Sequence, residues 1–220
     1  MKKLILCGAF AVLLAGCGGK DGDEGTIPPK SVPLAVGNWW FYRNTPDTTS
    51  YDTTIIISDT TYNGKAGFVV ETRSYTPDTQ TTDTFIAYYD GGFLWITYEF
   101  QTDTPIPMLI TAEFKSLPEE NLAVGDTWTA MDKDTTIDFP PPVNIRVLVT
   151  AEILSRESKS VPAGDFADCY KVAYRWTWTV NGSPVSNTTN FHWVYPGVGI
   201  VYSQDSSSAG GSELVDYEVQ

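Results

Sequence analysis

The fold of this chain is decided by the stretch DCYKVAYRWTWTV, residues 168–180. Along it, large apolar side chains occupy every second position: Tyr170, Val172, Tyr174, Trp176, Trp178 and Val180. The positions between them hold polar side chains, namely Lys171, Arg175, Thr177 and Thr179. Because successive side chains of a β-strand point to opposite faces, this period of two predicts a strand with one face turned to a core.

Turn signals bound this strand and others. Asn181-Gly182 follows it directly, and Asn63-Gly64 is a second copy of the same dipeptide. A two-residue type I′ hairpin needs positive φ at both central residues, which Asn and Gly tolerate. Asp90-Gly91-Gly92 is a similar signal. The sequence therefore predicts antiparallel hairpins at all three places.

The rest of the body repeats the strand pattern. In NIRVLVTAEI, residues 144–153, the predicted buried face consists of Ile145, Val147, Val149, Ala151 and Ile153. Short runs rich in Thr, Val, Ile, Tyr and Trp recur between turns, and helical spacing is nearly absent. These features predict an all-β fold with little helix. We expect a large curved antiparallel sheet or an open β-barrel of about ten strands, because flat open sheets of that width are uncommon.

A short internal repeat bears on the architecture. LAVGNWWFYR, residues 34–43, returns as LAVGDTWTAM, residues 122–131, with Leu, Ala, Val, Gly and one Trp at matching offsets. Each copy is typical of a Gly-containing turn that leads into a strand whose Trp enters the core. The repeat predicts two structurally similar halves, and the alternative is two independent occurrences of a favourable turn.

The N-terminal residues predict export. Lys2 and Lys3 precede the apolar residues 4–16, which is the layout of a secretory signal, and this run is shorter than the ~18 residues of a membrane span. LAGC, residues 14–17, resembles the lipobox of bacterial lipoproteins, in which the cysteine is lipidated. We expect a signal peptide over residues 1–16, a lipid anchor at Cys17, an acidic Gly/Pro-rich linker over 17–33 and a single β domain over 34–220.

The charge of the chain argues against one class of partner, and its cysteine content argues against an intramolecular disulfide. Removing residues 1–16 leaves 12 Lys and Arg against 27 Asp and Glu, a formal net charge of −15. Such a surface repels phosphate backbones, so nucleic acid is not an expected partner. Cys7 leaves with the signal and Cys17 carries lipid, so Cys169 has no partner for an intramolecular disulfide.

The sequence gives little support for a catalytic site or a metal site. A two-residue turn at Asn181-Gly182 predicts that Lys171 pairs with His192, which places Cys169 diagonally from that histidine. Diagonal positions are ~7–8 Å apart, too far for a thiol and its base, so no catalytic residue is expected. One histidine and one cysteine cannot build a usual zinc site. Asp132, Asp134 and Asp138 lack the glycine and terminal Glu of a calcium loop, so neither a metal nor a cofactor is expected.

The C-terminal third carries a family resemblance. It contains VPAGDFADCYKV (residues 161–172), WVYPGVGIVYSQ (193–204) and GSELVDYEV (211–219). This combination resembles the closing module of uncharacterised bacterial lipoproteins of the TapB-like domain family, which are distantly similar to the open β-barrels of the LolA and LolB carriers. The resemblance implies an open barrel. The chain departs from those carriers because it has no clear amphipathic helix to plug the sheet.

These observations favour a non-enzymatic binding or structural module of the cell envelope. Its curved sheet would bind an envelope protein or an apolar ligand, with Trp176, Trp178 and Trp193 as candidate wall residues. The alternative is a carboxylate-dependent hydrolase acting on glycans or peptides, although the sequence selects no carboxylate pair. The acidic cluster after Cys17 resembles surface-export signals of some Bacteroidetes lipoproteins. We therefore expect an extracytoplasmic protein anchored in the bacterial outer membrane, on its periplasmic or surface side.

Overall fold

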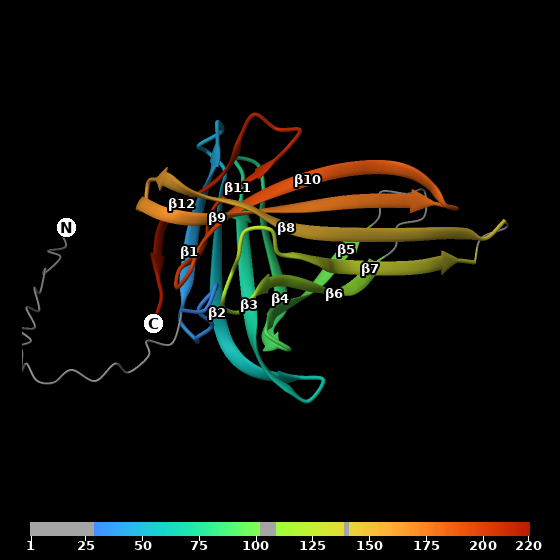
Figure 1. Cartoon of the computed structure of the whole chain (residues 1–220), viewed down its shortest axis with the longest axis horizontal. Coiled ribbons are helices and arrows are strands. Elements are labelled where there is room, and N and C mark those ends of the chain that lie inside the picture. Colours follow the sequence, from blue (N-terminus) through green and yellow to red (C-terminus); the bar gives the residue numbers. More distant parts are fainter. Residues whose placement is uncertain (1–28, 102–108, 139–140) are drawn as a thin grey trace, which may run out of the picture.

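The computed structural model describes residues 29–101, 109–138 and 141–220, and these residues form strands and turns without a helix (Figure 1). The strands are β1 (Trp39–Thr45), β2 (Tyr51–Tyr62), β3 (Lys65–Tyr75), β4 (Gln80–Asp90), β5 (Phe93–Gln101), β6 (Leu109–Pro118), β7 (Thr127–Ile137), β8 (Val143–Val161), β9 (Gly164–Val180), β10 (Ser183–Tyr195), β11 (Gly199–Asp205) and β12 (Gly211–Glu218). Within the described residues, no helix is long and apolar enough to cross a membrane.

All twelve strands belong to one antiparallel sheet, in the order β6-β5-β4-β3-β2-β1-β12-β11-β10-β9-β8-β7. Two six-strand meanders, β1–β6 and β7–β12, are therefore joined by the pairing of β1 with β12. The sheet curls into a nearly closed barrel, from which the outer parts of β7 to β10 extend as a long arm (Figure 1). The prediction of an all-β antiparallel sheet is confirmed.

The predicted number of about ten strands was too low, because polar strand segments give no apolar alternation to detect. In β4, for example, Gln80 to Thr84 are all exposed and yet pair with β3. Sequence patterning registers mainly strands that bury one face along their whole length. It therefore undercounts strands whose ends project beyond the core.

The predicted hairpin turns are present. Asn63 and Gly64 have φ of 50° and 78°, and Asn181 and Gly182 have φ of 48° and 77°. Both residues of each turn thus adopt the positive φ of a type I′ hairpin. The third turn also forms, with Gly91 and Gly92 as its two residues between β4 and β5.

The register of the β9–β10 hairpin differs from the prediction. Ser183 pairs with Val180 as a two-residue turn requires, but an irregularity between Pro184 and Ser186 shifts all later pairs by one. Val185, the extra residue, is 61% exposed, as expected for a β-bulge. His192 consequently pairs with Val172 rather than with Lys171.

The two LAVG segments form the same turn. In the first, the Gly37 amide donates to the Ile56 carbonyl at 2.8 Å and the Asn38 amide donates to Ala35 at 3.1 Å. In the second, the Gly125 amide donates to Ile153 at 2.8 Å and the Asp126 amide donates to Ala123 at 3.1 Å. Both glycines have φ of 95°, a conformation that glycine adopts without strain.

The barrel lacks a backbone ladder between its two edge strands, β6 and β7, and we call this gap the seam. Side chains bridge it. The Trp128 indole of β7 donates a hydrogen bond of 2.9 Å to the Lys115 carbonyl of β6. The Tyr174 hydroxyl of β9 donates another, of 2.7 Å, to the Ser116 carbonyl. Two carbonyls of edge strand β6 thereby accept hydrogen bonds from side chains of the other meander.

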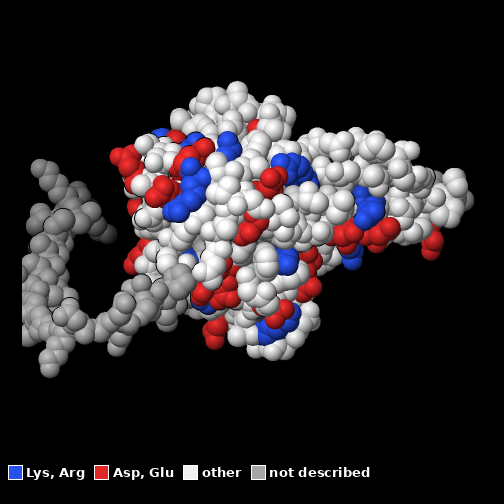
Figure 2. Space-filling view, viewed as in Figure 1, with Lys and Arg blue, Asp and Glu red and all other residues white. Residues whose placement is uncertain are grey.

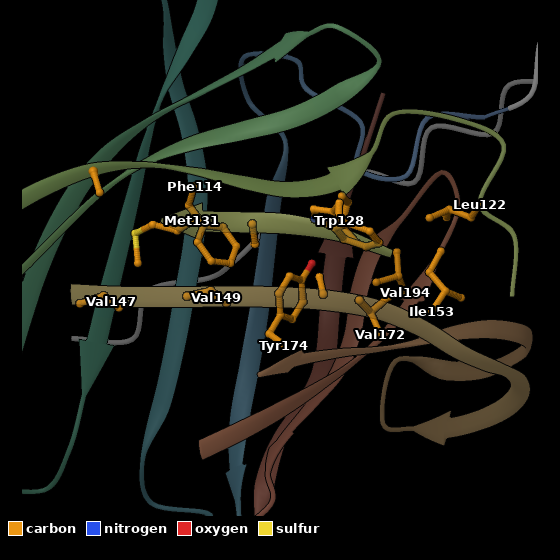
Figure 3. Close-up of a cluster of buried hydrophobic side chains, with 14 residues drawn as sticks. Phe114, Leu122, Trp128, Met131, Val147, Val149, Ile153, Val172, Tyr174 and Val194 are labelled. Carbon is orange, nitrogen blue, oxygen red and sulfur yellow. The ribbon is translucent and has the colours of Figure 1, made fainter. Parts of the chain in front are cut away.

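A core of apolar side chains packs behind the seam (Figure 3). This seam cluster comprises Ala112, Phe114, Leu117, Leu122, Trp128, Ala130, Met131, Val147, Val149, Ala151, Ile153, Val172, Tyr174 and Val194. Figure 3 shows Phe114, Trp128 and Tyr174 close together in this cluster. Their ring centres lie 5.5 Å and 6.2 Å from that of Tyr174. The predicted buried face of residues 144–153 belongs to this cluster, apart from Ile145, which is also buried.

The seam can be tested with Trp128→Phe, which keeps a ring but removes the indole donor. We expect the free energy of unfolding to fall by about 1–3 kcal/mol, because the Lys115 carbonyl loses its partner and the smaller ring leaves space. Urea denaturation followed by circular dichroism measures the change.

Trp39→Phe is the matched control, because the Trp39 indole donates to Glu218 at an exposed position. Its effect should stay within about 0.5 kcal/mol. Equal losses in the two variants would show that the bridge across the seam contributes nothing specific.

Candidate functional site

A cavity with a volume of about 440 Å³ lies inside the barrel. We call it the chamber. Its apolar wall comprises Val32, Leu34, Trp40, Ile56, Val70, Phe85, Ala87, Leu94, Ile96, Leu117 and Ile200. Its polar wall comprises Tyr42, Asp52, Thr54, Thr72, Ser74, Ser116, His192, Ser203 and Ser212, with Gly199 completing the lining. The volume lies in the range of small-molecule sites, ~300–1,000 Å³.

The chamber becomes less polar from one end to the other. Three cross-strand pairs of β2 and β3 show the gradient: Asp52 with Ser74, then Thr54 with Thr72, then Ile56 with Val70. The two Thr hydroxyls are 3.1 Å apart and hydrogen-bonded to each other. Because residues two apart point to the same face of a strand, all three pairs line one continuous wall. The chamber therefore has a polar end and an apolar end.

The apolar end is closed by residues 30–36, which we call the strap. The strap is held by an ion pair of 2.6 Å between Lys30 and Glu119 and by a 2.8 Å hydrogen bond from the Gly197 amide to the Lys30 carbonyl. The Tyr89 hydroxyl donates to the Val32 carbonyl. Residues 29–33 belong to the predicted linker, and in the structure they pack on the barrel.

The polar end lies near the loops at residues 46–50, 76–79 and 206–210, because Tyr51 pairs with Tyr75 and Thr45 pairs with Gly211. Two of these loops, 46–50 and 206–210, lie at the top of Figure 1. The C-terminus lies at the lower left of Figure 1, where the Gln220 amide donates to Asn38 at 3.1 Å. The strap and the polar end are therefore at opposite ends of the barrel.

A second cavity of about 330 Å³ adjoins the polar end, and we call it the vestibule. It shares His192, Ser203 and Ser212 with the chamber. Its remaining wall is Asn44, Thr45, Asn190, Gln204, Asp205, Ser208, Gly210 and Gly211. The vestibule is thus lined mainly by amides, hydroxyls and backbone, in contrast to the apolar depth of the chamber.

His192 stands where the two cavities meet. Its ring packs against the Tyr174 ring, with the ring centres 5.0 Å apart. Burial lowers the pKa of His192 from 6.5 to about 4, because the charged imidazolium would lose its hydration. Its remaining exposure faces the two cavities that it lines. At neutral pH the imidazole is therefore uncharged, with one nitrogen that donates and one that accepts.

Cys169 does not cooperate with His192. It pairs with Glu157 of β8, is fully buried, and its thiol contacts the Phe166 carbonyl at 3.6 Å. Burial raises its pKa to about 11, so the thiol stays protonated at neutral pH. A protonated, buried thiol is a poor nucleophile.

The three predicted wall tryptophans lie outside the lining of the chamber. Trp176 and Trp178 are half-buried against the seam cluster, and the Trp176 ring stacks on Phe114 at 5.8 Å. Trp193 neighbours His192 in the chain and therefore points to the opposite face of β10. The tryptophan that does line the chamber is Trp40, whose indole donates to the Val198 carbonyl at 2.7 Å.

Trp193 belongs to a second core cluster, together with Trp40, Val201 and Leu214, and two lysines lie over its ring. Lys159 lies 4.3 Å from the centre of the Trp193 ring and 3.6 Å from that of Tyr202. Lys171 lies 4.7 Å from the Trp193 ring, and the Trp193 indole donates to the Glu157 carboxylate. These contacts cover Trp193, which is 4% exposed.

The remaining predicted site residues are placed as follows. Asp132 accepts two hydrogen bonds of 2.7 Å from Arg146, and Asp134 accepts one from the Asn144 amide. Among the described residues, no group of three or more His, Cys, Asp or Glu side chains is arranged to hold a metal ion. The signal peptide over residues 1–16 and the lipidation site Cys17 lie outside the described residues.

Sequence reasoning missed the polar wall of the chamber. Asp52, Thr54, Thr72 and Ser74 belong to Thr-rich segments that are typical of exposed strand faces. Their spacing could have revealed them, because Asp52 and Thr54 lie four and two positions before the apolar Ile56 and so point to the same face of the strand. Polar and apolar residues on one face of a strand indicate an interior that changes in polarity along the barrel.

Comparisons with known proteins show similarity of fold. No family model matches the chain, and no curated protein matches it. The crystal structure described as "a putative lipoprotein from Parabacteroides distasonis ATCC 8503" aligns with a TM-score of 0.54 and 14% identity, over 88% of this chain and 100% of that chain. "A putative exported protein with YmcC-like fold" from Bacteroides fragilis NCTC 9343 aligns with a TM-score of 0.52 and 15% identity, over 86% of this chain and 99% of that chain.

These neighbours refine the resemblance drawn from the sequence. At these identities the likeness extends to the fold, which is the YmcC-like fold of the second neighbour. Similarity to the TapB-like family or to the LolA and LolB carriers is not confirmed by the comparisons.

The burial of His192 generates a pH prediction. Between pH 6.5 and about 4 the imidazole is protonated in the unfolded chain but not in the fold, so the unfolded state binds more protons. The free energy of unfolding should therefore fall as the pH drops from 7 to 5. His192→Phe, which does not titrate, should show a smaller fall. Urea denaturation at both pH values measures this, and equal falls in the two proteins would contradict the burial of a neutral imidazole.

Proposed function

We propose that this chain is a lipid-anchored, extracytoplasmic protein of the bacterial envelope that binds an apolar or amphiphilic small molecule inside its barrel. The observation that carries the proposal is the chamber, an interior cavity of about 440 Å³ with an apolar end and a polar end. Concave apolar pockets with a few convergent polar groups are the usual form of small-molecule sites. The barrel wall supplies such a pocket.

Binding without catalysis is the activity that these side chains support. The Cys169 thiol is buried and protonated. Cys169 pairs with Glu157 of β8, whereas His192 pairs with Val172 of β9. The alternative of a carboxylate-dependent hydrolase needs two acidic groups in one site. Asp52 is the single carboxylate that lines the chamber. Asp205, in the vestibule, accepts hydrogen bonds from the amide and hydroxyl of Ser207, which lower its pKa and so disfavour a general-acid role.

Location and partners are also part of the proposal. The lipobox-like LAGC at residues 14–17 supports an acylated Cys17, and the two structural neighbours are described as a lipoprotein and an exported protein. Figure 2 shows acidic and basic side chains interspersed on the face in view, and the chain carries a net charge of −13. This charge supports the absence of nucleic acid among the partners.

Filling the chamber tests the binding proposal. Ala87 is 3% exposed and lines the chamber, so Ala87→Phe should occupy its apolar part. We expect the affinity for a neutral apolar fluorophore, N-phenyl-1-naphthylamine, to fall by roughly tenfold or more, as one lost ring-sized contact implies. Fluorescence titration measures the affinity, and a thermal melt verifies folding.

Ala66→Phe is the control, because Ala66 lies at an exposed position of β3, the strand that pairs with the β4 strand of Ala87. It makes the same chemical change outside the chamber and should leave the affinity unchanged. Equal affinity in both variants would place the fluorophore elsewhere and remove the support for the chamber as a binding site.

The lipid anchor has its own test. Bacteria expressing the full chain and fed radiolabelled palmitate should incorporate the label into the protein, because a lipobox cysteine receives acyl chains. Cys17→Ser should abolish the label and release the protein from the membrane fraction. Labelling that persists in Cys17→Ser would refute an anchor at this position.

A further inference from the structure

The chamber and the vestibule share His192, Ser203 and Ser212, so an apolar cavity continues into a polar one. A molecule that fills both must itself be apolar at one end and polar at the other. The chamber volume of about 440 Å³ corresponds to roughly fifteen water-sized groups at ~30 Å³ each. A methylene is similar in size, so this space can hold one alkyl chain of about that length.

The charges around the vestibule select against an anionic head group. No Lys or Arg occurs among the residues of the described chain that line either cavity. The lining does contain two carboxylates, Asp52 in the chamber and Asp205 in the vestibule. A phosphate, sulfate or carboxylate head would therefore meet like charge without a compensating cation.

The hydrogen-bonding groups favour a head that both donates and accepts. The Oδ1 atom of Asn190, in the vestibule wall, is buried and accepts no hydrogen bond from the described residues. It requires a donor from a ligand or a water. The amide of Asn44 and the hydroxyls of Ser203 and Ser212 can donate as well as accept, as can the neutral ring of His192. A hydroxyl group matches both needs, whereas an ammonium offers no acceptor.

We infer that the ligand is a single-chain amphiphile with an uncharged polyhydroxyl head, such as a sugar or a glycerol. Its alkyl chain lies in the chamber and its hydroxyls meet Asn190, His192 and their neighbours in the vestibule. This inference rests on the proposed binding function and adds the chemical class of the ligand. A sugar and a glycerol share the same chemistry, and the experiment distinguishes them.

The test compares probes with one chain and different heads. The mature chain, residues 17–220 with Cys17→Ser so that no acyl groups are present, is titrated with dodecyl maltoside, monododecanoyl glycerol, dodecyl sulfate and dodecyltrimethylammonium. Each probe is used below its critical micelle concentration, and calorimetry gives the affinity. At least one of the two uncharged hydroxylated probes should bind on the order of tenfold more tightly than both ionic probes, as two or three hydrogen bonds imply. The stronger of the two identifies the head.

Variants locate the head group. Asn190→Leu should remove this preference, because the hydroxylated head loses its hydrogen-bond partner in the vestibule. Asn187→Leu is the matched control on β10, since Asn187 is exposed and outside both cavities. If Asn190→Leu does not fold, Asn44→Leu tests the same vestibule.

The outcomes separate the two proposals. Binding of the fluorophore with equal affinity for all dodecyl probes, or with a preference for an ionic probe, overturns the polyhydroxyl head and leaves the chamber as an apolar site. A preference that survives in both Asn190→Leu and Asn44→Leu also overturns it. Failure of the fluorophore and of every dodecyl probe to bind overturns the proposed function itself.

Discussion

The barrel depends on how the two edge strands of its sheet, β6 and β7, are joined without a backbone ladder between them. Eleven strand pairings leave β6 and β7 as free edges that are adjacent in the chain. The Trp128 indole and the Tyr174 hydroxyl satisfy carbonyls of β6, and the rings of Phe114, Trp128 and Tyr174 pack behind them. Closure therefore relies on side chains, which hold the wall of the chamber in place without fixing a strand register between β6 and β7.

Local features of the fold could be read from the sequence because they depend on a few adjacent residues. The Asn-Gly turns and the buried face of residues 144–153 follow from φ preferences and from a period of two. The LAVG repeat likewise corresponds to two turns with matching hydrogen bonds. The bulge at Val185 could not be read in this way, because its cost and benefit depend on the twist of the assembled strands. One extra residue was enough to move His192 to a new partner.

The candidate site was less predictable than the fold, because it is formed by residues that are distant in the chain. Trp176 and Trp178 have the strongest alternation, yet that alternation reports packing against Phe114 and its neighbours. The chamber is instead lined by residues from both meanders, such as Thr54 and His192, which the curl of the sheet brings to one interior. Aromatic content indicates where apolar area is buried, whereas a ligand site also requires that space be left unfilled.

The strap connects the N-terminal segment of the chain to the apolar end of the chamber. Val32 and Leu34 form part of the cavity wall, and they are also the first wall residues that follow the N-terminal segment. Tension applied through that segment would load the Lys30–Glu119 ion pair and the Gly197 amide before it reached any strand. The strap is thus the place where the described part of the chain would first transmit a pull from its N-terminal side to the barrel.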